Sequence, residues 1–184
     1  AAAGDGGALH AGFGSGLQLT GVQVASNAAG GNGGGVAATA AALVATNASL
    51  VFNGADGAGG GIAGDASSSV ILVTTTVASN NAGGVGGGVS TAGVLSVTNA
   101  CNVSHNVAVS GGGASCQRTA SVVVEDSLFD GNSAADAGGG VMCDGCACEL
   151  GSGSRLEHNT VGEAASVLDS AARGGGGAYF AVDP

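Results

Sequence analysis

Two markers recur along the chain with one period of 26 or 27 residues, and this repeat constrains the fold more than any other feature. The first marker is a run of three glycines followed by a small or branched residue. The second is an asparagine standing three positions after an apolar residue. The six asparagines are Asn27, Asn53, Asn80, Asn106, Asn132 and Asn159, at spacings of 26, 27, 26, 26 and 27. Two independent markers on one period indicate a chain built from structural repeats.

Each period also contains short apolar runs, such as 70–73 and 122–124, which are typical of β-strands. No period holds a convincing helix, and two or three short strands are expected in each. One such unit cannot bury its apolar face alone, whereas stacked units can. The sequence therefore predicts an all-β fold, a right-handed parallel β-helix (solenoid) of about six coils of 26–27 residues.

The glycine runs are interpreted as tight corners that lead into a strand, because glycine tolerates positive φ and close backbone approach. The residues that follow them are predicted to form one inward column: Val36, Ile62, Val89, Ala114, Val141 and Ala178. The apolar residues of the second marker are predicted to form another: Val24, Leu50, Val77, Val103, Phe129 and Leu156. The six asparagines should stack at a turn, their amides pairing with each other and with corner carbonyls.

Composition excludes several classes of function. The only basic residues are Arg118, Arg155 and Arg173, against 13 Asp and Glu, and the net charge is −10. Nucleic-acid binding is excluded because it needs a basic footprint. The longest strongly apolar run, 70–73, is far short of the roughly 20 residues of a membrane-spanning helix. With no Trp and four Phe, the core must rely on close stacking of backbone and small side chains.

The two markers also carry a family resemblance. Phe129-Asp130-Gly131-Asn132, followed by Gly138-Gly139-Gly140-Val141, resembles the repeat of the chlamydial polymorphic outer membrane proteins, whose signatures are F-x-x-N and GGA-[I/L/V]. The resemblance extends from about Gly6 to Ala178. It implies a β-helix of the autotransporter-passenger kind, displayed outside the cell and often used for adhesion. Similar repeats occur in secreted proteins with pectate-lyase-like folds.

Five cysteines lie in the second half of the chain. Cys116 and Cys143 hold the same position after successive glycine corners, so they should stack about 4.8 Å apart, and a disulfide between them is predicted. The alternative is a buried pair of free thiols. The segment 143–148 holds three cysteines, and a turn with a local disulfide is favoured over a zinc knuckle because no second Cys or His pair is expected beside it. Disulfides would indicate an oxidising compartment.

The fifth cysteine, Cys101, occupies an inward position between Thr75 and Ser127 of neighbouring coils. It is expected to be an unpaired core thiol. Two N-glycosylation sequons begin at Asn47 and Asn102, and strand alternation places both side chains outward.

The remaining charged residues offer weak candidate sites. Glu125, Asp126 and Asp130 form the densest acidic group, with Arg155 one coil later. They are interpreted as a solvated face, with a weak cation site as the alternative. His105 and His158 share one position two coils apart, roughly 10 Å, and with His10 are expected to line turns. No catalytic residue, metal site or cofactor is predicted.

The whole chain, 1–184, is predicted to be one domain with an insertion over 160–173, whose later part has helical composition. It begins and stops at the same phase of the repeat without a polar capping unit. Either it is a segment of a longer β-helix or its copies stack end to end. Residues 1–110 carry only Asp5, Asp56 and Asp65 as charges, which suits a surface covered by glycan or by lateral neighbours.

These observations favour a non-catalytic structural protein, part of an extracellular fibre, coat or cell-surface appendage. The expected partners are copies of itself or adjacent coils. One alternative is an adhesin-like passenger domain that binds a host or matrix receptor. A second is a carbohydrate-active β-helix enzyme, which scarce aromatic residues and the missing pair of acid-base carboxylates disfavour.

Overall fold

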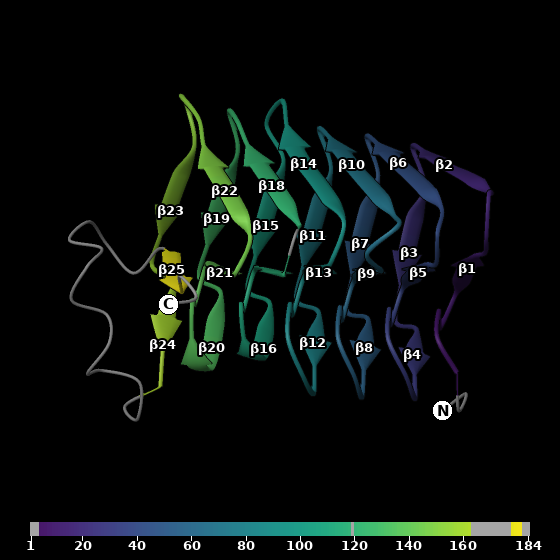
Figure 1. Cartoon of the computed structure of the whole chain (residues 1–184), viewed down its shortest axis with the longest axis horizontal. Coiled ribbons are helices and arrows are strands. Elements are labelled where there is room, and N and C mark those ends of the chain that lie inside the picture. Colours follow the sequence, from purple (N-terminus) through teal and green to yellow (C-terminus); the bar gives the residue numbers. More distant parts are fainter. Residues whose placement is uncertain (1–3, 119, 163–177, 182–184) are drawn as a thin grey trace.

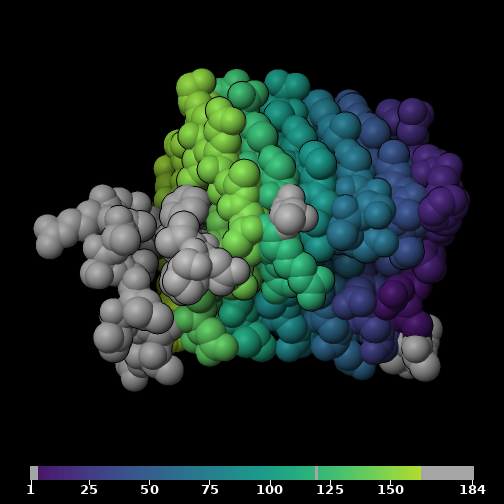
Figure 2. Space-filling model, in the orientation of Figure 1, coloured from purple at the N-terminus to yellow at the C-terminus, as the bar shows by residue number. Residues whose placement is uncertain are grey.

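The computed structural model describes residues 4–118, 120–162 and 178–181, and every regular element in them is a β-strand. The strands stack along one axis into a rod, with early strands at one end and late strands at the other (Figure 1). The space-filling view shows the coils as adjoining bands (Figure 2). Within this described part, no helix is long and apolar enough to cross a bilayer.

Four parallel sheets run along the rod. The first sheet contains β1 (Leu9–Ala11), β5 (Val36–Ala38), β9 (Ile62–Gly64), β13 (Val89–Thr91), β17 (Ala114–Gln117), β21 (Val141–Asp144) and β25 (Ala178–Ala181). The second contains β2 (Gly16–Thr20), β6 (Ala42–Thr46), β10 (Ser69–Val73), β14 (Val94–Thr98), β18 (Ser121–Val124) and β22 (Ala147–Leu150).

The other two sheets have shorter strands. The third contains β3 (Gln23–Ala25), β7 (Ser49–Val51), β11 (Thr76–Ala78), β15 (Asn102–Ser104), β19 (Leu128–Asp130) and β23 (Arg155–Glu157). The fourth contains β4 (Ala28–Ala29), β8 (Gly54–Ala55), β12 (Asn81–Ala82), β16 (Val107–Ser110), β20 (Ser133–Ala137) and β24 (Thr160–Val161).

Each coil crosses the four sheets once, and its residues pair with those one period later. Leu50, Val77 and Val103, for example, are register partners in three successive coils. The prediction of an all-β parallel solenoid of about six coils is confirmed. The expectation of two or three strands per coil was too low, because strands as short as β4 and β8 show no periodic pattern in the sequence.

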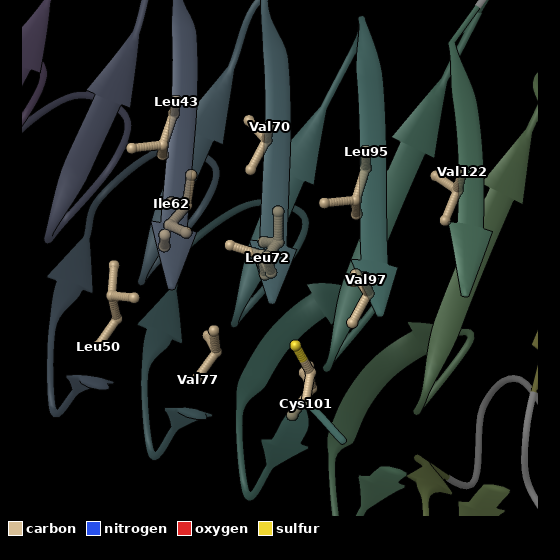
Figure 3. Close-up of a cluster of buried hydrophobic side chains, with 14 of the residues drawn as sticks. Leu43, Leu50, Ile62, Val70, Leu72, Val77, Leu95, Val97, Cys101 and Val122 are labelled. Atoms are coloured by element: carbon tan, nitrogen blue, oxygen red, sulfur yellow. The ribbon is translucent and has the colours of Figure 1, made fainter. Parts of the chain in front are cut away.

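The core is a set of columns in which like side chains stack on like. Leu43, Val70, Leu95 and Val122 hold one position in successive coils, and each is almost completely buried (Figure 3). Burial of an aliphatic side chain of this size stabilises the fold by roughly 1.5–3 kcal/mol. A column repeats that contribution at every coil.

Both predicted inward columns are present. Ile62 and Val89 pair in register in the first sheet and are fully buried. In the third sheet, Phe129 is the bulkiest fully buried residue, while Leu156 at the end of its column is only half-buried. Ala178 pairs in register with Val141. The predicted insertion over 160–173 starts within β24, and from residue 163 it lies outside the described residues.

The glycine corners allow the turns themselves to stack. The first glycine of a run has a positive φ, 68° at both Gly59 and Gly86. The second glycine lies against the next coil, so that a Cβ on Gly60 would collide with the carbonyl oxygens of Gly87 and Asn81. The two positions therefore need glycine for different reasons, one conformational and one steric.

Gly60→Ala should destabilise the protein by about 1–3 kcal/mol, because the methyl group must displace stacked backbone. The matched control is Gly54→Ala, where the nearest atom to an added Cβ is 4.0 Å away. That change should be neutral or stabilising by up to about 1 kcal/mol. Denaturant midpoints of the two variants test this expectation, and equal midpoints would contradict the steric role of the second glycine.

Candidate functional site

The six marker asparagines lie in one interior column where the chain turns from the third sheet into the fourth. The side-chain amide of each asparagine from Asn27 to Asn132 donates to the Oδ1 of the asparagine in the next coil, at 2.9–3.1 Å. Each Oδ1 from Asn53 onward also accepts from the backbone N–H of the preceding asparagine. The column is buried apart from Asn27, which is half-buried.

The same amides bind the backbone of the apolar residues that stand three positions before each asparagine. The second Nδ2 hydrogen of Asn80 is donated to the carbonyl oxygen of Leu50, at 2.9 Å. Asn106 donates in the same way to the carbonyl of Val77. The apolar residue thus sends its side chain into the core and its carbonyl to the amide of the next coil. Both hydrogens and the oxygen of an interior amide are satisfied.

A second polar column lies at the turn between the second and third sheets. The Thr75 amide donates to the Cys101 sulfur at 3.3 Å, and the Cys101 amide donates to the Ser127 hydroxyl at 3.2 Å. Cys101 is buried and unpaired, in the position predicted for it. Burial raises the pKa of its thiol above the ordinary value and keeps it neutral. It is a packing residue in this site, with a weakly polar sulfur.

The other four cysteines converge at one place in the coils that carry β17 and β21. Two disulfides join Cys116 to Cys146 and Cys143 to Cys148. The Cα atoms of these pairs lie 6.2 and 6.4 Å apart. All four sulfurs lie within 4.8 Å of one another.

This pairing corrects the predicted disulfide between Cys116 and Cys143. The two residues are register partners, as expected, but side chains of in-register parallel strands point the same way and do not converge as a disulfide requires. Cys146 and Cys148 follow a turn at Gly145, which has φ 63°. Each of the two stacked cysteines therefore forms its disulfide with one cysteine that follows this turn, Cys116 with Cys146 and Cys143 with Cys148.

The outer face of the first sheet forms the floor of a surface groove. From β5 to β17 its outward residues are small and nevertheless buried, with Ala37, Ser90 and Ser115 exposing 3%, 8% and 0% of their surface. The volume of this groove, as lined by the described residues, is about 170 Å³. The Ser115 hydroxyl is buried on this face and has no hydrogen-bond partner among the described residues.

The carboxylates of the groove are held by backbone amides. Asp5 Oδ1 accepts from the Asn32 N–H at 2.6 Å. Burial alone would raise the pKa of Asp65, but hydrogen bonds from the Ser68 hydroxyl and the Ala40 and Ser67 amides hold the pKa below its ordinary value. Asp65 is therefore an ionised acceptor fixed in a turn, which suits it to holding the groove wall rather than to donating a proton.

Three of the outer charged residues lie together, since ligand atoms of Asp130, Glu157 and His158 are all within 4.8 Å of one another. Arg155 pairs with Glu157 at 3.4 Å, and 62% and 40% of their side-chain surfaces are exposed. His158 Nδ1 lies 2.7 Å from Asp130 Oδ1. The hydrogen bond and charge of Asp130, with a smaller contribution from Glu157, raise the pKa of His158 above 6.5. His105 and His158 both sit at exposed turn positions with positive φ, 54° and 52°.

The sequon asparagines Asn47 and Asn102 are both exposed. Asn47 adopts a positive φ of 50° at a turn, and Asn102 begins β15. Both side chains are therefore accessible to a glycan.

Comparison with known proteins adds no relative. No protein-family model, no curated protein sequence and no solved structure matches the chain. The fold of a parallel β-solenoid therefore rests on the chain's own geometry.

Sequence reasoning missed the groove and the approach of Cys116 to the segment 143–148. The groove had no signal, because its floor is made of alanines and serines that look like ordinary outward residues. The sulfur cluster had one: Cys116 stacks on Cys143, which places a fourth sulfur beside the three cysteines of 143–148.

Asn80→Ala should lower the free energy of unfolding by roughly 1–3 kcal/mol for each buried group left unpaired. Those groups are the Asn53 backbone N–H, the Asn53 side-chain amide and the Leu50 carbonyl. The adjacent Asn81 is exposed, and Asn81→Ala should change stability by no more than about 0.5 kcal/mol. Urea denaturation of the two variants measures the difference. An equal loss of unfolding free energy in the two variants would show that the asparagine column makes no specific contribution to stability.

The His158–Asp130 pair should make stability depend on pH with a defined sign. Because the folded pKa of His158 is raised, its contribution is full below pH 6.5 and is lost as pH rises through the folded pKa. An NMR titration of the ring should show the raised pKa in the native protein. Asp130→Asn should lower that pKa more than Glu157→Gln does, and the reverse order would contradict the assignment.

Proposed function

We propose that this chain is a structural, non-catalytic β-solenoid of an extracellular or cell-surface fibre, coat or appendage. The observation that carries the proposal is the use made of its polar side chains. Most of their hydrogen bonds join one coil to the next, as in the asparagine column and in the bonds from Asn32 to Asp5 and from Ala58 to Asn32. Polar groups used in this way stiffen a rod along its axis.

The extracellular location is supported by chemistry and by the motif resemblance. Two disulfides are compatible with an oxidising compartment. The two markers resemble repeats that are displayed outside the cell. The exposed sequon residues Asn47 and Asn102 offer glycan positions if the protein passes through a secretory pathway that glycosylates.

The partner proposed for the rod is another set of β-solenoid coils. In the described part of the chain, β2, β3 and β4 are each paired on one side only. An open strand edge is a template for another strand. We propose that these edges meet either additional coils or a second copy of the chain.

A second candidate function, binding of an extended ligand by an adhesin-like surface, is favoured by the groove along the first sheet. Its small floor residues and the polar side chains of its walls, such as Thr39 and Gln117, suit a narrow polar chain such as a glycan. Binding would require no catalytic group.

Electron microscopy and sedimentation of the purified chain test the structural proposal. We expect rods that lengthen end to end as concentration rises. Protein isolated from its natural source without reductant should titrate as one free thiol per chain, Cys101, because the other four cysteines are paired.

Two outcomes would replace the proposal. A chain that stays monomeric and retains a soluble polysaccharide would support the binding role, provided that Ala63→Arg in the groove floor abolishes retention. The control is Ala42→Arg at an exposed position of β6. Detectable cleavage of a polysaccharide would support the carbohydrate-active enzyme instead.

A further inference from the structure

The cluster of four sulfurs is more compact than two separate disulfides require. Cys116 Sγ lies 3.4 Å from Cys148 Sγ, and Cys146 Sγ lies 3.9 Å from Cys148 Sγ, although neither contact is a disulfide bond. The four residues come from four places: Cys116 from β17, Cys143 from β21, Cys146 from the turn after β21, and Cys148 from β22. The fold therefore holds four thiol positions around one point.

These separations fit a tetrahedral metal. With Zn–S bonds of about 2.3 Å, the sulfurs of a four-thiolate zinc site lie about 3.8 Å apart. All four sulfurs here are within 4.8 Å of one another. The Cys116–Cys148 and Cys146–Cys148 sulfur separations, 3.4 and 3.9 Å, are already close to this spacing, and on reduction the two bonded pairs would move apart toward it.

The local sequence has the character of a zinc site. Cys143 and Cys146 are separated by two residues, a common ligand spacing, and Gly145 between them has the positive φ of a tight turn. The turn is anchored by the Arg118 amide, which donates to the Asp144 carbonyl at 2.8 Å.

The burial of the four residues suits both holding an ion and admitting one. Cys116 and Cys143 are buried, whereas Cys146 and Cys148 are half-buried. The buried pair fixes the site in the core. The partly exposed pair gives a reductant and a cation a route to it.

We propose that Cys116, Cys143, Cys146 and Cys148, when reduced, bind one Zn²⁺ as a four-thiolate site that clamps the coil of β17 to the coil of β21. Each of the two disulfides takes up two electrons and two protons from one molecule of a dithiol, which is itself oxidised to a disulfide. The four thiols then bind Zn²⁺ and release four protons. The same four positions thus give one coil-to-coil bridge in an oxidising compartment and another in a reducing one.

Zinc is the cation that the donor set favours. Four thiolates select soft or borderline-soft metals over Mg²⁺ and Ca²⁺, which take oxygen ligands. Zn²⁺ has no redox chemistry and accepts the tetrahedral geometry that the four sulfurs approach. The proposal goes beyond the structural role, and it holds or fails whether or not the rods assemble.

The test uses the full chain reduced anaerobically with a phosphine, which consumes one phosphine and one water per disulfide and yields two thiols and a phosphine oxide. Co²⁺ is then titrated as a spectroscopic probe. We expect the ligand-field and sulfur-to-cobalt charge-transfer bands of a tetrahedral four-thiolate complex, saturating at one Co²⁺ per chain. One equivalent of Zn²⁺ should displace it.

Two variants separate this site from simpler alternatives. Cys116→Ser should weaken Co²⁺ binding by at least about 10–100-fold, the loss known even for second-shell partners, and should shift the charge-transfer band toward that of three thiolates. Cys101→Ser removes the distant core thiol and should leave the titration unchanged. Far-UV circular dichroism, recorded at each step, reports whether the coils persist or form with the metal.

A reduced chain that shows no four-thiolate Co²⁺ spectrum, whether folded or unfolded, would overturn the proposal. Equal Co²⁺ affinity in the wild type and in Cys116→Ser would also overturn it. That result would place the metal on the local segment 143–148 and remove any bridge between coils.

Discussion

Hydrogen bonding between successive coils in one register determines the rest of this structure. It continues through the corners as well as the strands, since the Gly34 amide donates to Gly59 and the Gly60 amide donates to Gly86. A one-residue slip of a strand against its neighbour would turn the inward residues of that strand outward, so differences in coil length are absorbed outside the paired strands or at an irregularity such as the one between Ala108 and Ser110. Glycine is needed at the corners because stacked turns bring backbone against backbone. Like-on-like columns in the core follow from this register.

The two interior polar columns solve one problem in different ways. Where a coil bends, the chain presents N–H and C=O groups to an apolar interior, and each must find a partner. An asparagine amide has both donors and an acceptor, so it can pair with the next amide and with a carbonyl at the same time. At the other bend a single hydroxyl or thiol group, which has only one hydrogen to donate, suffices, and Thr75, Cys101 and Ser127 occupy that position in turn. That difference explains why one column is uniform and the other is mixed.

The proposed roles use the parts of the solenoid that are not needed for packing or for bonds between coils. Its interior is committed to packing and its turns to coil-to-coil bonds, so chemistry can reside only on an outer face or at an irregular corner. The groove of the first sheet is the outer face, and the turn at Gly145 is the corner. At that corner the stacking of Cys116 on Cys143 places buried sulfurs next to half-buried ones, and the redox state of the surroundings would select a disulfide pair or a thiolate cluster.

The sequence by itself determined the coil length, the glycine corners, the apolar columns and the position of the asparagines, because each is local to one coil and is repeated six times. It also placed Cys101 between Thr75 and Ser127. Only the tertiary structure decided the fourth sheet, the partners of Cys116 and Cys143, and the burial of Ser115. The partners of Cys116 and Cys143 depend on how the turn at Gly145 folds back toward the core. The groove depends on residues outside the strands of the first sheet. A periodic pattern carries no information about either.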